Sequence, residues 1–200
     1  MRAKIGKILC LAVFCALFLP GVARAQVAVG DNMPALTATT LDGKKFDLSA
    51  LKGKVVIINF WATWCPACHE EMPALEAVWR QYRGQGLQVL AISCDLPRTR
   101  GDVGQVMNYF SFPAAMFGDL TKNGFGTPQS IPVTYVIDKQ GVVRDILSPD
   151  VTPVTESGLG DIVKDLLAAK DAEKPDAKKT DDKPAAAPAA PPAAKTENAQ

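Results

Sequence analysis

The chain has 200 residues, with 22 Lys and Arg against 21 Asp and Glu and a formal net charge of +1. This length fits one folded domain with appendages, and 48% hydrophobic residues supply a core, which excludes a wholly disordered or fibrous chain. The balanced charge gives no basic surface, so nucleic acid is not expected as a partner. The five cysteines and the single histidine are more informative than these averages.

Residues 1–25 have the pattern of a secretory signal peptide. A positive start, Arg2 to Lys7, precedes an apolar run from Ile8 to Leu19, and Ala23-Arg24-Ala25 supplies small residues for cleavage before Gln26. The apolar run is shorter than the roughly 20 residues that span a bilayer, which favours a cleaved signal peptide. The alternative is that the segment is retained as a membrane anchor. We expect an exported, periplasmic protein that after cleavage carries 18 basic against 21 acidic groups, a net charge of −3.

The C-terminal segment, residues 171–200, differs in composition from the rest of the chain. Ala, Pro, Lys and Asp predominate there, so it has few side chains whose burial could offset the entropy of ordering. We predict a disordered tail, partly in the polyproline II conformation. The folded domain is therefore expected at residues 26–170.

The middle of the chain alternates predicted strands and helices. Strands are indicated by continuous or alternating apolar residues, and helices by apolar residues three and four apart. The first elements are a hairpin from Leu36 to Leu48 around Asp42-Gly43, a strand at 54–61, a helix after it that ends at Gly84 and Gly86, and a strand at 87–93. A helix at 102–110, a short strand at 114–117, a hairpin of strands 133–138 and 142–147, and a helix at 156–169 follow. This order predicts an α/β fold, a mixed sheet with helices on both faces.

Two cysteines separated by two residues, Cys65 and Cys68, lie between a predicted buried strand and a predicted helix. Cys65 would be the N-cap of the helix and Pro66 its first residue, where proline loses no hydrogen bond. The helix dipole and the free N–H groups then stabilise a thiolate at Cys65, and such cysteines have pKa values of about 3.5–7.5. This predicts a redox-active Cys65–Cys68 disulfide, with Cys65 as the exposed nucleophile and Cys68 as the resolving thiol.

Two other uses of the cysteine pair stay open. Cys65-Pro-Ala-Cys68-His69 also fits the haem-attachment pattern C-x-x-C-H, with His69 as the axial ligand. Two thiolates could instead carry copper, which would make the protein a copper-binding chaperone. A closed four-ligand metal site is not expected, because no second pair exists and Cys94 is the only other cysteine after cleavage. The redox interpretation of the pair needs no cofactor, so none is predicted with it, and Cys94 is expected to be a buried, inert thiol.

The stretch from Phe60 to Cys68, Phe-Trp-Ala-Thr-Trp-Cys-Pro-Ala-Cys, resembles the active site of the thioredoxin superfamily. With Glu71 and Pro73 after the pair, it resembles the TlpA/ResA-like branch of exported thiol–disulfide oxidoreductases. The resemblance covers about residues 28–170 and includes Ile131-Pro132. It implies a thioredoxin-like three-layer sandwich with a mixed central sheet and an added N-terminal β-hairpin.

The same resemblance implies roles for particular residues. Pro132 would be cis and face the cysteine pair, and the backbone of Ile131 would pair with the substrate chain. Trp64, Pro66 and Ala67 would form the rest of the surface that meets the substrate.

Two departures from the pattern affect the mechanism. Thioredoxin has a buried aspartate six residues before the first cysteine, where this chain has Asn59, which cannot act as a base. Glu71, three residues beyond Cys68 and on the same face of the helix, is therefore assigned the proton relay that deprotonates Cys68. A peroxidase of the related peroxiredoxin type is not expected, because Ala62 and Ile58 replace the residues it needs.

The predicted activity is dithiol–disulfide exchange with a disulfide-containing protein substrate. The resemblance implies a reductant that serves cytochrome c maturation or copper-oxidase assembly. In an oxidising compartment such a reductant needs a membrane electron donor. The protein is expected to be a monomer.

Overall fold

The computed structural model describes residues 26–169, which form a seven-stranded mixed sheet with three α-helices. The predicted signal peptide and the predicted C-terminal tail lie outside the described residues. Within residues 26–169, no helix is long and apolar enough to cross a membrane. The strands are β1 (Leu36–Thr40), β2 (Lys45–Asp47), β3 (Val55–Trp61), β4 (Leu87–Ser93), β5 (Ala114–Asn123), β6 (Val133–Ile137) and β7 (Val143–Leu147). The α-helices are α2 (Pro66–Tyr82), α3 (Arg100–Met107) and α4 (Glu156–Ala168).

β3 is an interior strand of the sheet, between β4 and β6, and every residue of this strand is buried. Its Val- and Ile-rich run suits a strand that is covered on both faces. β3 pairs in parallel with β4 and antiparallel with β6, within the strand order β2-β1-β5-β4-β3-β6-β7. The predicted mixed sheet is confirmed, and β4 has the predicted bounds.

The predicted N-terminal hairpin is also confirmed. β1 and β2 pair antiparallel, and the turn between them contains Gly43 at φ +80°, a conformation that glycine adopts readily. The Thr40 N–H donates to the Lys44 carbonyl at 2.8 Å and closes the turn. Because β1 also pairs with β5, the hairpin extends the sheet by two strands at that edge.

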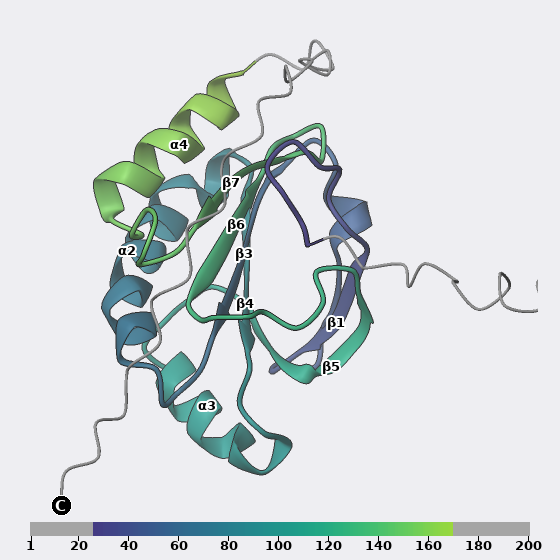
Figure 1. Cartoon of the computed structure of the whole chain (residues 1–200), viewed down its shortest axis with the longest axis vertical. Helices are drawn as coiled ribbons and strands as arrows, with labels where there is room; N and C mark the ends of the chain where they lie inside the picture. Colours follow the sequence, from purple (N-terminus) through teal and green to yellow (C-terminus); the bar gives the residue numbers. More distant parts are fainter. Residues whose placement is uncertain (1–25, 170–200) are drawn as a thin grey trace, which may run out of the picture.

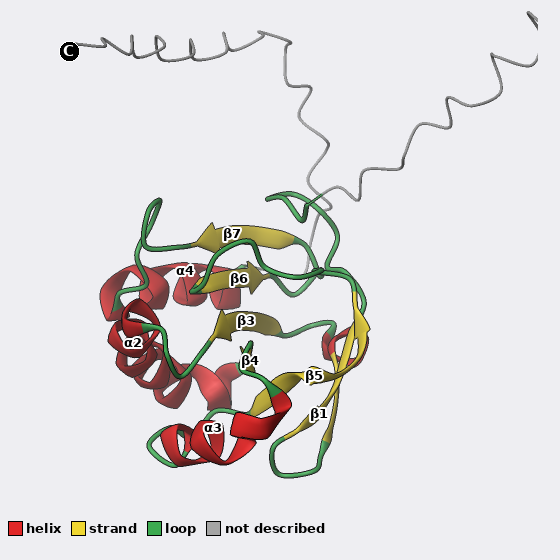
Figure 2. Ribbon diagram, turned by 60° about the horizontal axis from the view of Figure 1, so that its bottom comes forward, coloured by secondary structure: helices red, strands yellow, loops and turns green. Residues whose placement is uncertain are grey.

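The prediction of helices on both faces is wrong. α2, α3 and α4 all pack on one face, where Met72, Val103 and Leu159 share one apolar cluster (Figures 1 and 2). The chain steps from β3 to β4 to β5 in one direction across the sheet, and two right-handed crossovers in one direction place both helices on the same face.

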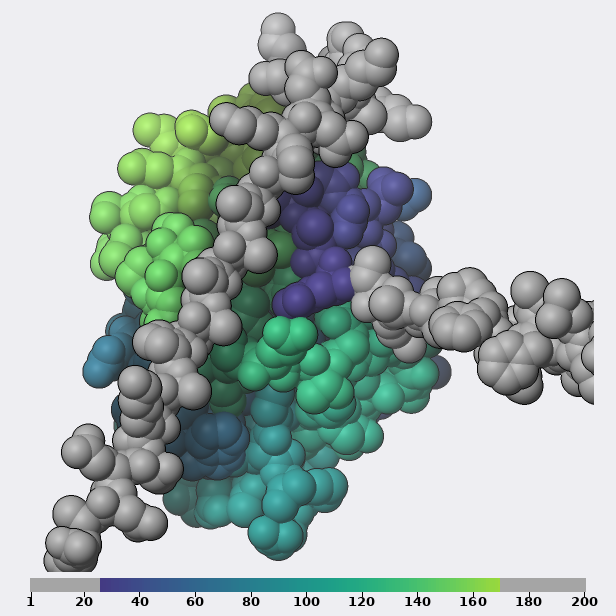
Figure 3. Space-filling model, viewed as in Figure 1, coloured from purple at the N-terminus to yellow at the C-terminus, as the bar shows by residue number. Residues whose placement is uncertain are grey.

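The opposite face is covered by short and irregular segments. The 3-10 helix Leu48–Leu51 lies there, and Val27, Met33 and Phe125 join the apolar cluster of that face. Figure 3 shows the purple N-terminal residues beside the green segment that follows β5. The sheet is thus covered on both sides, but by α-helices on one side only.

Two predicted elements have different bounds in the structure. β5 continues to Asn123 instead of ending at 117, since its second half pairs antiparallel with β1, with Leu120 opposite Ala38. Those residues are partly exposed and polar, so hydrophobicity gave no indication of a strand. α3 ends at Met107, and the loop after it is held by Glu76, which accepts hydrogen bonds from the N–H and hydroxyl of Ser111 at 2.8 and 2.7 Å.

Candidate active site

Three chain segments meet where β3 and β4 end and β6 begins. Trp61, the last residue of β3, pairs with Ser93, the last of β4, and Phe60 pairs with Val133, the first of β6. The residues just beyond these strand ends therefore lie along one edge of the sheet. They are residues 62–68, 94–95 and 131–132.

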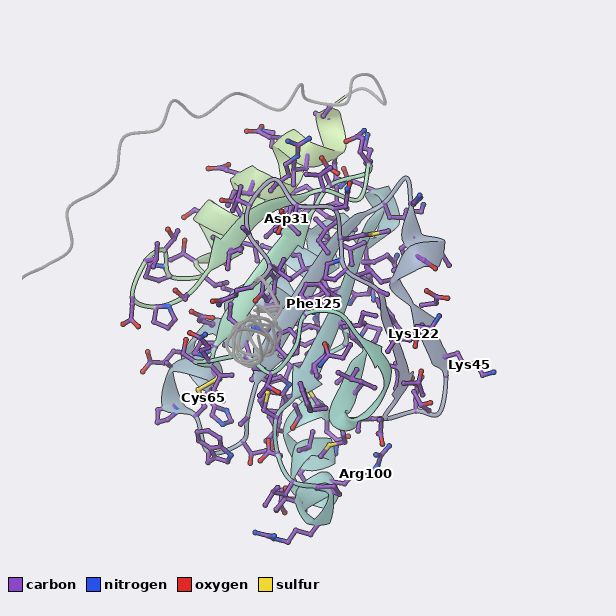
Figure 4. All side chains as sticks on the ribbon, turned by 45° about the vertical axis from the view of Figure 1, so that its right-hand side comes forward. Asp31, Lys45, Cys65, Arg100, Lys122 and Phe125 are labelled. Carbon is purple, nitrogen blue, oxygen red and sulfur yellow. A yellow bond between two sulfur atoms is a disulfide. The ribbon has the colours of Figure 1, made fainter. Side chains whose placement is uncertain are left out.

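Cys65 and Cys68 form a disulfide at the start of α2, with their Cα atoms 5.3 Å apart. Figure 4 shows the yellow sulfur–sulfur bond beside the Cys65 label, at the periphery of the fold. Cys65 is the N-cap of α2, its Sγ accepts a hydrogen bond from the Cys68 N–H at 3.2 Å, and Pro66 opens the helix. The sulfur of Cys65 thus lies where the helix dipole and free N–H groups favour negative charge.

The cysteine pair is less exposed than the sequence suggested. Cys65, predicted as an exposed nucleophile, is only 5% exposed, and Cys68 is 1% exposed. The Sγ atom of Cys65 is bonded to that of Cys68 and lies 3.9 Å from the carbonyl oxygen of Ile131. By contrast, Trp64 is 68% exposed and Pro66 is also exposed. A partner that reaches Cys65 therefore contacts its neighbours in the chain.

Ile131 and Pro132 lie opposite the cysteine pair. The Ile131–Pro132 peptide bond is cis, the geometry that the resemblance implies. Together with Trp64, Ile131 lines a groove of about 460 Å³ that continues over Phe117 and along residues 127–130. None of the groove's lining side chains carries a formal charge. The groove therefore lies next to Cys65, because one of its lining residues, Trp64, precedes Cys65 in the chain and another, Ile131, faces the Cys65 sulfur.

Glu71 is buried at 7% exposure, on the second turn of α2. Its Oε1 accepts a hydrogen bond from the Val154 N–H at 3.4 Å, and its Oε2 has no hydrogen-bond partner. Burial raises the pKa of the Glu71 carboxyl, and the Val154 N–H opposes this rise. A carboxyl group in this state takes up and releases protons closer to neutral pH than an ordinary glutamate does.

Asn59 lies in β3, on the sheet face that packs against α2. This face is fixed by the alternation of the strand, since Ile57 and Trp61 belong to the apolar cluster that contains Cys68. Asn59 is 3% exposed, its Nδ2 donates to the Thr134 hydroxyl at 2.9 Å, and its Oδ1 has no partner. A buried, unpaired acceptor is therefore present on the α2 face in addition to Glu71.

The only histidine contacts the loop before the cysteines. The Nε2 atom of His69 lies 2.8 Å from the Thr63 carbonyl oxygen, and its ring packs edge-on against Trp61. The ring is exposed, so it contributes to the surface around the disulfide. Among residues 26–169, no three or more His, Cys, Asp or Glu side chains are grouped so that they could hold a metal ion.

Cys94 differs from its predicted state as a buried thiol, because it is half-buried and lines the groove beside Trp64. Burial and, to a smaller extent, the charge of Asp95 raise the pKa of its thiol to about 11. A thiol with this pKa is almost fully protonated at neutral pH, and the protonated form is a poor nucleophile. Cys94 therefore forms part of the groove wall and does not compete with Cys65.

Asp95 was not predicted as a site residue, yet it is buried and hydrogen-bonded to the loop before Cys65. Its carboxylate accepts hydrogen bonds from the Thr63 N–H at 2.8 Å and from the Thr63 hydroxyl at 2.6 Å. The sequence offered one indication of its role: Asp95 is a polar residue shortly after a buried strand, at the sheet edge that carries the cysteine motif. Nothing in the local sequence connects it to Thr63, 32 residues earlier.

The chain is similar in sequence to known oxidoreductases. Residues 29–146 match the AhpC/TSA family. Thiol-disulfide oxidoreductase ResA of Bacillus cereus is 33% identical over 145 residues, which cover 71% of this chain and 83% of that protein. The thioredoxin-like protein YneN of Bacillus subtilis is 33% identical over 121 residues, 58% of this chain and 69% of that protein.

Solved structures agree with these relatives. A thiol:disulfide interchange protein of the thioredoxin family from Chlorobium tepidum superposes with a TM-score of 0.59 at 28% identity, over 70% of this chain and 98% of that one. The haem and copper alternatives find no counterpart among these relatives. The disulfide at the start of α2, the similar sequences and the similar fold lead to one conclusion: this chain belongs to the AhpC/TSA family and is a thiol–disulfide oxidoreductase with a thioredoxin-like fold.

Proposed function

We propose that this oxidoreductase is an exported reductant of protein disulfides, of the type that serves cytochrome c maturation or copper-oxidase assembly. The observation that carries the proposal is the Cys65–Cys68 disulfide at the N-terminus of α2, beside the backbone of Ile131. A cysteine at a helix N-terminus is held as a reactive thiolate, and an adjacent carbonyl offers a substrate chain a backbone partner. The relatives named ResA support the assignment to this branch.

In the proposed cycle, the reduced protein attacks a substrate disulfide. The Cys65 thiolate forms a bond to one substrate sulfur and expels the other as a thiolate, which takes up a proton. Cys68 then attacks the sulfur of Cys65, which re-forms the protein disulfide and releases the second substrate thiol. Two electrons pass from the protein dithiol to the substrate, so a membrane electron donor is needed to regenerate the dithiol.

Glu71 is the proposed base for the second step. Its burial, its raised pKa and its unbonded Oε2 are the properties of a carboxyl group that can accept a proton near neutral pH. It lies three residues after Cys68 on α2, so the two side chains share one face of the helix. The transfer takes place directly or through one water molecule, and the amide of Asn59 cannot act as a base in its place.

The groove beside Cys65 is the proposed contact for the substrate chain. Trp64, Pro66 and Ala67 are close to Cys65 in the chain, and the carbonyl oxygen of Ile131, which precedes cis-Pro132, lies 3.9 Å from its sulfur. Trp64 and Ile131 line the groove. The exposed Trp64 ring offers a large apolar surface at the mouth of the uncharged groove. Contacts of this kind favour an extended segment of the substrate with uncharged side chains near its cysteine.

Replacing Trp64 by alanine tests this contact. We expect Trp64→Ala to raise KM for a protein disulfide about tenfold and to leave kcat within about twofold, because an exposed aromatic anchor binds substrate without touching the reacting sulfurs. Tyr109→Ala is the matched control, since Tyr109 is 82% exposed but does not line the groove. Equal effects of the two substitutions on KM would contradict the proposed groove.

Export and partners complete the proposal. Residues 1–25 are the proposed signal peptide, and the mature chain is the proposed monomeric, periplasmic form. An exported reductant meets an oxidising compartment, which is why a membrane electron donor is proposed as its second partner beside the protein substrate.

A redox titration of the mature domain against glutathione tests the direction of electron flow. We expect a potential nearer to the value of about −270 mV for thioredoxin than to the value of about −120 mV for strong oxidants. The fraction of protein in the disulfide form is measured by alkylating the free thiols and determining the mass of the product. A potential near the oxidant end would overturn the proposed reductant, and a pair that does not respond would favour the haem or copper alternatives.

A further inference from the structure

Asp95 is a buried carboxylate that the proposed cycle does not use. It is 6% exposed, and its oxygens accept three hydrogen bonds: from the Thr63 N–H at 2.8 Å, the Thr63 hydroxyl at 2.6 Å and the Ser93 hydroxyl at 2.8 Å. It forms no ion pair with a Lys, Arg or His side chain in the described residues. A side chain that only accepts hydrogen bonds has the pattern of an uncompensated carboxylate anion.

The partner of Asp95 is the loop that presents the nucleophile. Thr63 precedes Cys65 by two residues, and its carbonyl oxygen lies 2.8 Å from the Nε2 atom of His69. The amide, hydroxyl and carbonyl of this one residue are therefore all engaged, the first two by Asp95. On the adjoining segment, the Cys94 N–H donates to the Trp61 carbonyl at 2.7 Å. The loop between β3 and α2 is thus fixed from the end of β4.

We propose that Asp95 is a positioning residue that holds the Cys65 loop through Thr63 and whose negative charge disfavours the Cys65 thiolate, which keeps the cysteine pair reducing. The proposal rests on the proposed role of Cys65 as the nucleophile. The start of α2 stabilises a thiolate, and a stabilised thiolate in the reduced form makes a disulfide a stronger oxidant. A fixed anion beside the loop opposes this effect, and so favours the disulfide over the dithiol.

The neighbouring thiol supports this electrostatic role. The charge of Asp95 contributes, after burial, to the raised pKa of Cys94. The groove segment at residues 127–131 has no titratable side chain, and Asp150, in the loop between β7 and α4, is exposed. The titratable residues near the start of α2 are Cys68, His69, Glu70 and Glu71 of that helix, and Cys94 and Asp95 follow β4.

The substitution Asp95→Asn separates the charge from the geometry. The amide oxygen can accept from the Thr63 N–H and the Ser93 hydroxyl, while the amide nitrogen donates to the Thr63 hydroxyl, so all three contacts have a counterpart. We expect the midpoint pH of Cys65 alkylation in the reduced full-length protein to fall by about half a unit to one unit. The equilibrium with glutathione should move about threefold to tenfold towards the dithiol. Iodoacetamide labelling followed by mass analysis of the Cys65 peptide measures the first quantity.

Asp138→Asn is the control for the loss of a buried carboxylate far from Cys65, because Asp138 is 4% exposed, accepts a hydrogen bond from the Val142 N–H and pairs with Arg144 at the opposite end of the sheet. It should leave the alkylation midpoint unchanged. An unchanged or higher midpoint in D95N, an equal shift in D138N, or a D95N protein that does not fold would each overturn the proposal. Thr63→Val removes the hydrogen bond from the Thr63 hydroxyl to Asp95 but keeps the Asp95 charge. It should therefore lower kcat/KM without changing the midpoint pH of Cys65 alkylation. A parent Cys65 no more reactive than a free thiol would instead overturn the proposed function itself.

Discussion

Cys68→Ser should convert the enzyme into a trap for its substrate. The Cys65 thiolate of this variant still attacks a disulfide, but no second thiol in the motif can release the product. We expect turnover to fall below about one-thousandth of the parent rate, because an essential group of a two-step covalent mechanism is absent. A covalent complex through Cys65 should accumulate when the reduced variant is mixed with insulin. Non-reducing gels and mass analysis of the linked peptide measure it.

Two further serine variants make this result specific. Cys65→Ser should lose turnover to the same extent and form no covalent complex, because the sulfur at the N-cap of α2 is missing. Cys94→Ser should retain both turnover and release, since the pKa of its thiol is about 11 and it lies outside the disulfide. Normal catalysis by Cys68→Ser, or a complex formed through Cys94, would show that Cys68 is not the resolving thiol.

The fold was predictable where hydrophobicity is decisive. The runs that became β3 and β4 are mostly apolar, and the N-cap residue Cys65 with Pro66 marks the start of α2. The placement of the helices was not predictable in this way, because it depends on the order of the strands in the sheet. The local sequence shows the hydrophobic period of a helix or strand, but not the face of the sheet on which a connecting helix packs. The second half of β5 was missed for a related reason, since it pairs with a partly exposed strand and needs no apolar alternation.

In the candidate site, too, the features that depend on neighbouring residues could be predicted, and the contacts between distant residues could not. Cys65, Pro66 and Cys68 are close in sequence, so their spacing alone predicts a helix N-terminus with two thiols. Ile131 was connected to them only through the family resemblance, because nothing in its neighbourhood indicates a contact with Cys65. The contacts of Thr63 with Asp95 and of Glu71 with Val154 join residues 32 and 83 positions apart and become visible only in the folded chain.

Glu71→Gln should slow catalysis and stabilise the protein at the same time. The amide cannot accept the proton of Cys68, so we expect the resolving step to slow by about tenfold to a hundredfold near pH 7. The difference should shrink at high pH, where Cys68 loses its proton to solvent. Stopped-flow reduction of a disulfide substrate between pH 5 and pH 9, read as release of product from the mixed disulfide, measures the change.

The stability effect follows from the raised pKa of Glu71. Its ordinary value is 4.5, and burial places the folded-state pKa above this value. The folded state therefore binds the proton more tightly than the unfolded state does, and the stability associated with the neutral carboxyl is lost as pH rises through the folded-state pKa. The amide side chain of the variant does not titrate, so E71Q should match the parent below pH 4.5 and exceed it in free energy of unfolding at neutral pH. Urea unfolding of the oxidised protein at both pH values measures this difference.

Glu70→Gln provides the control for both effects, since Glu70 precedes Glu71 on α2 but is exposed. It removes the same charge from the same helix turn and should change neither the resolving rate nor the pH dependence of unfolding. An E71Q protein that resolves at the parent rate would remove Glu71 from the proposed relay. A rate loss without the gain in stability would mean that the carboxylate is held by favourable contacts in the folded state, in which case it would be a weaker base than the mechanism requires.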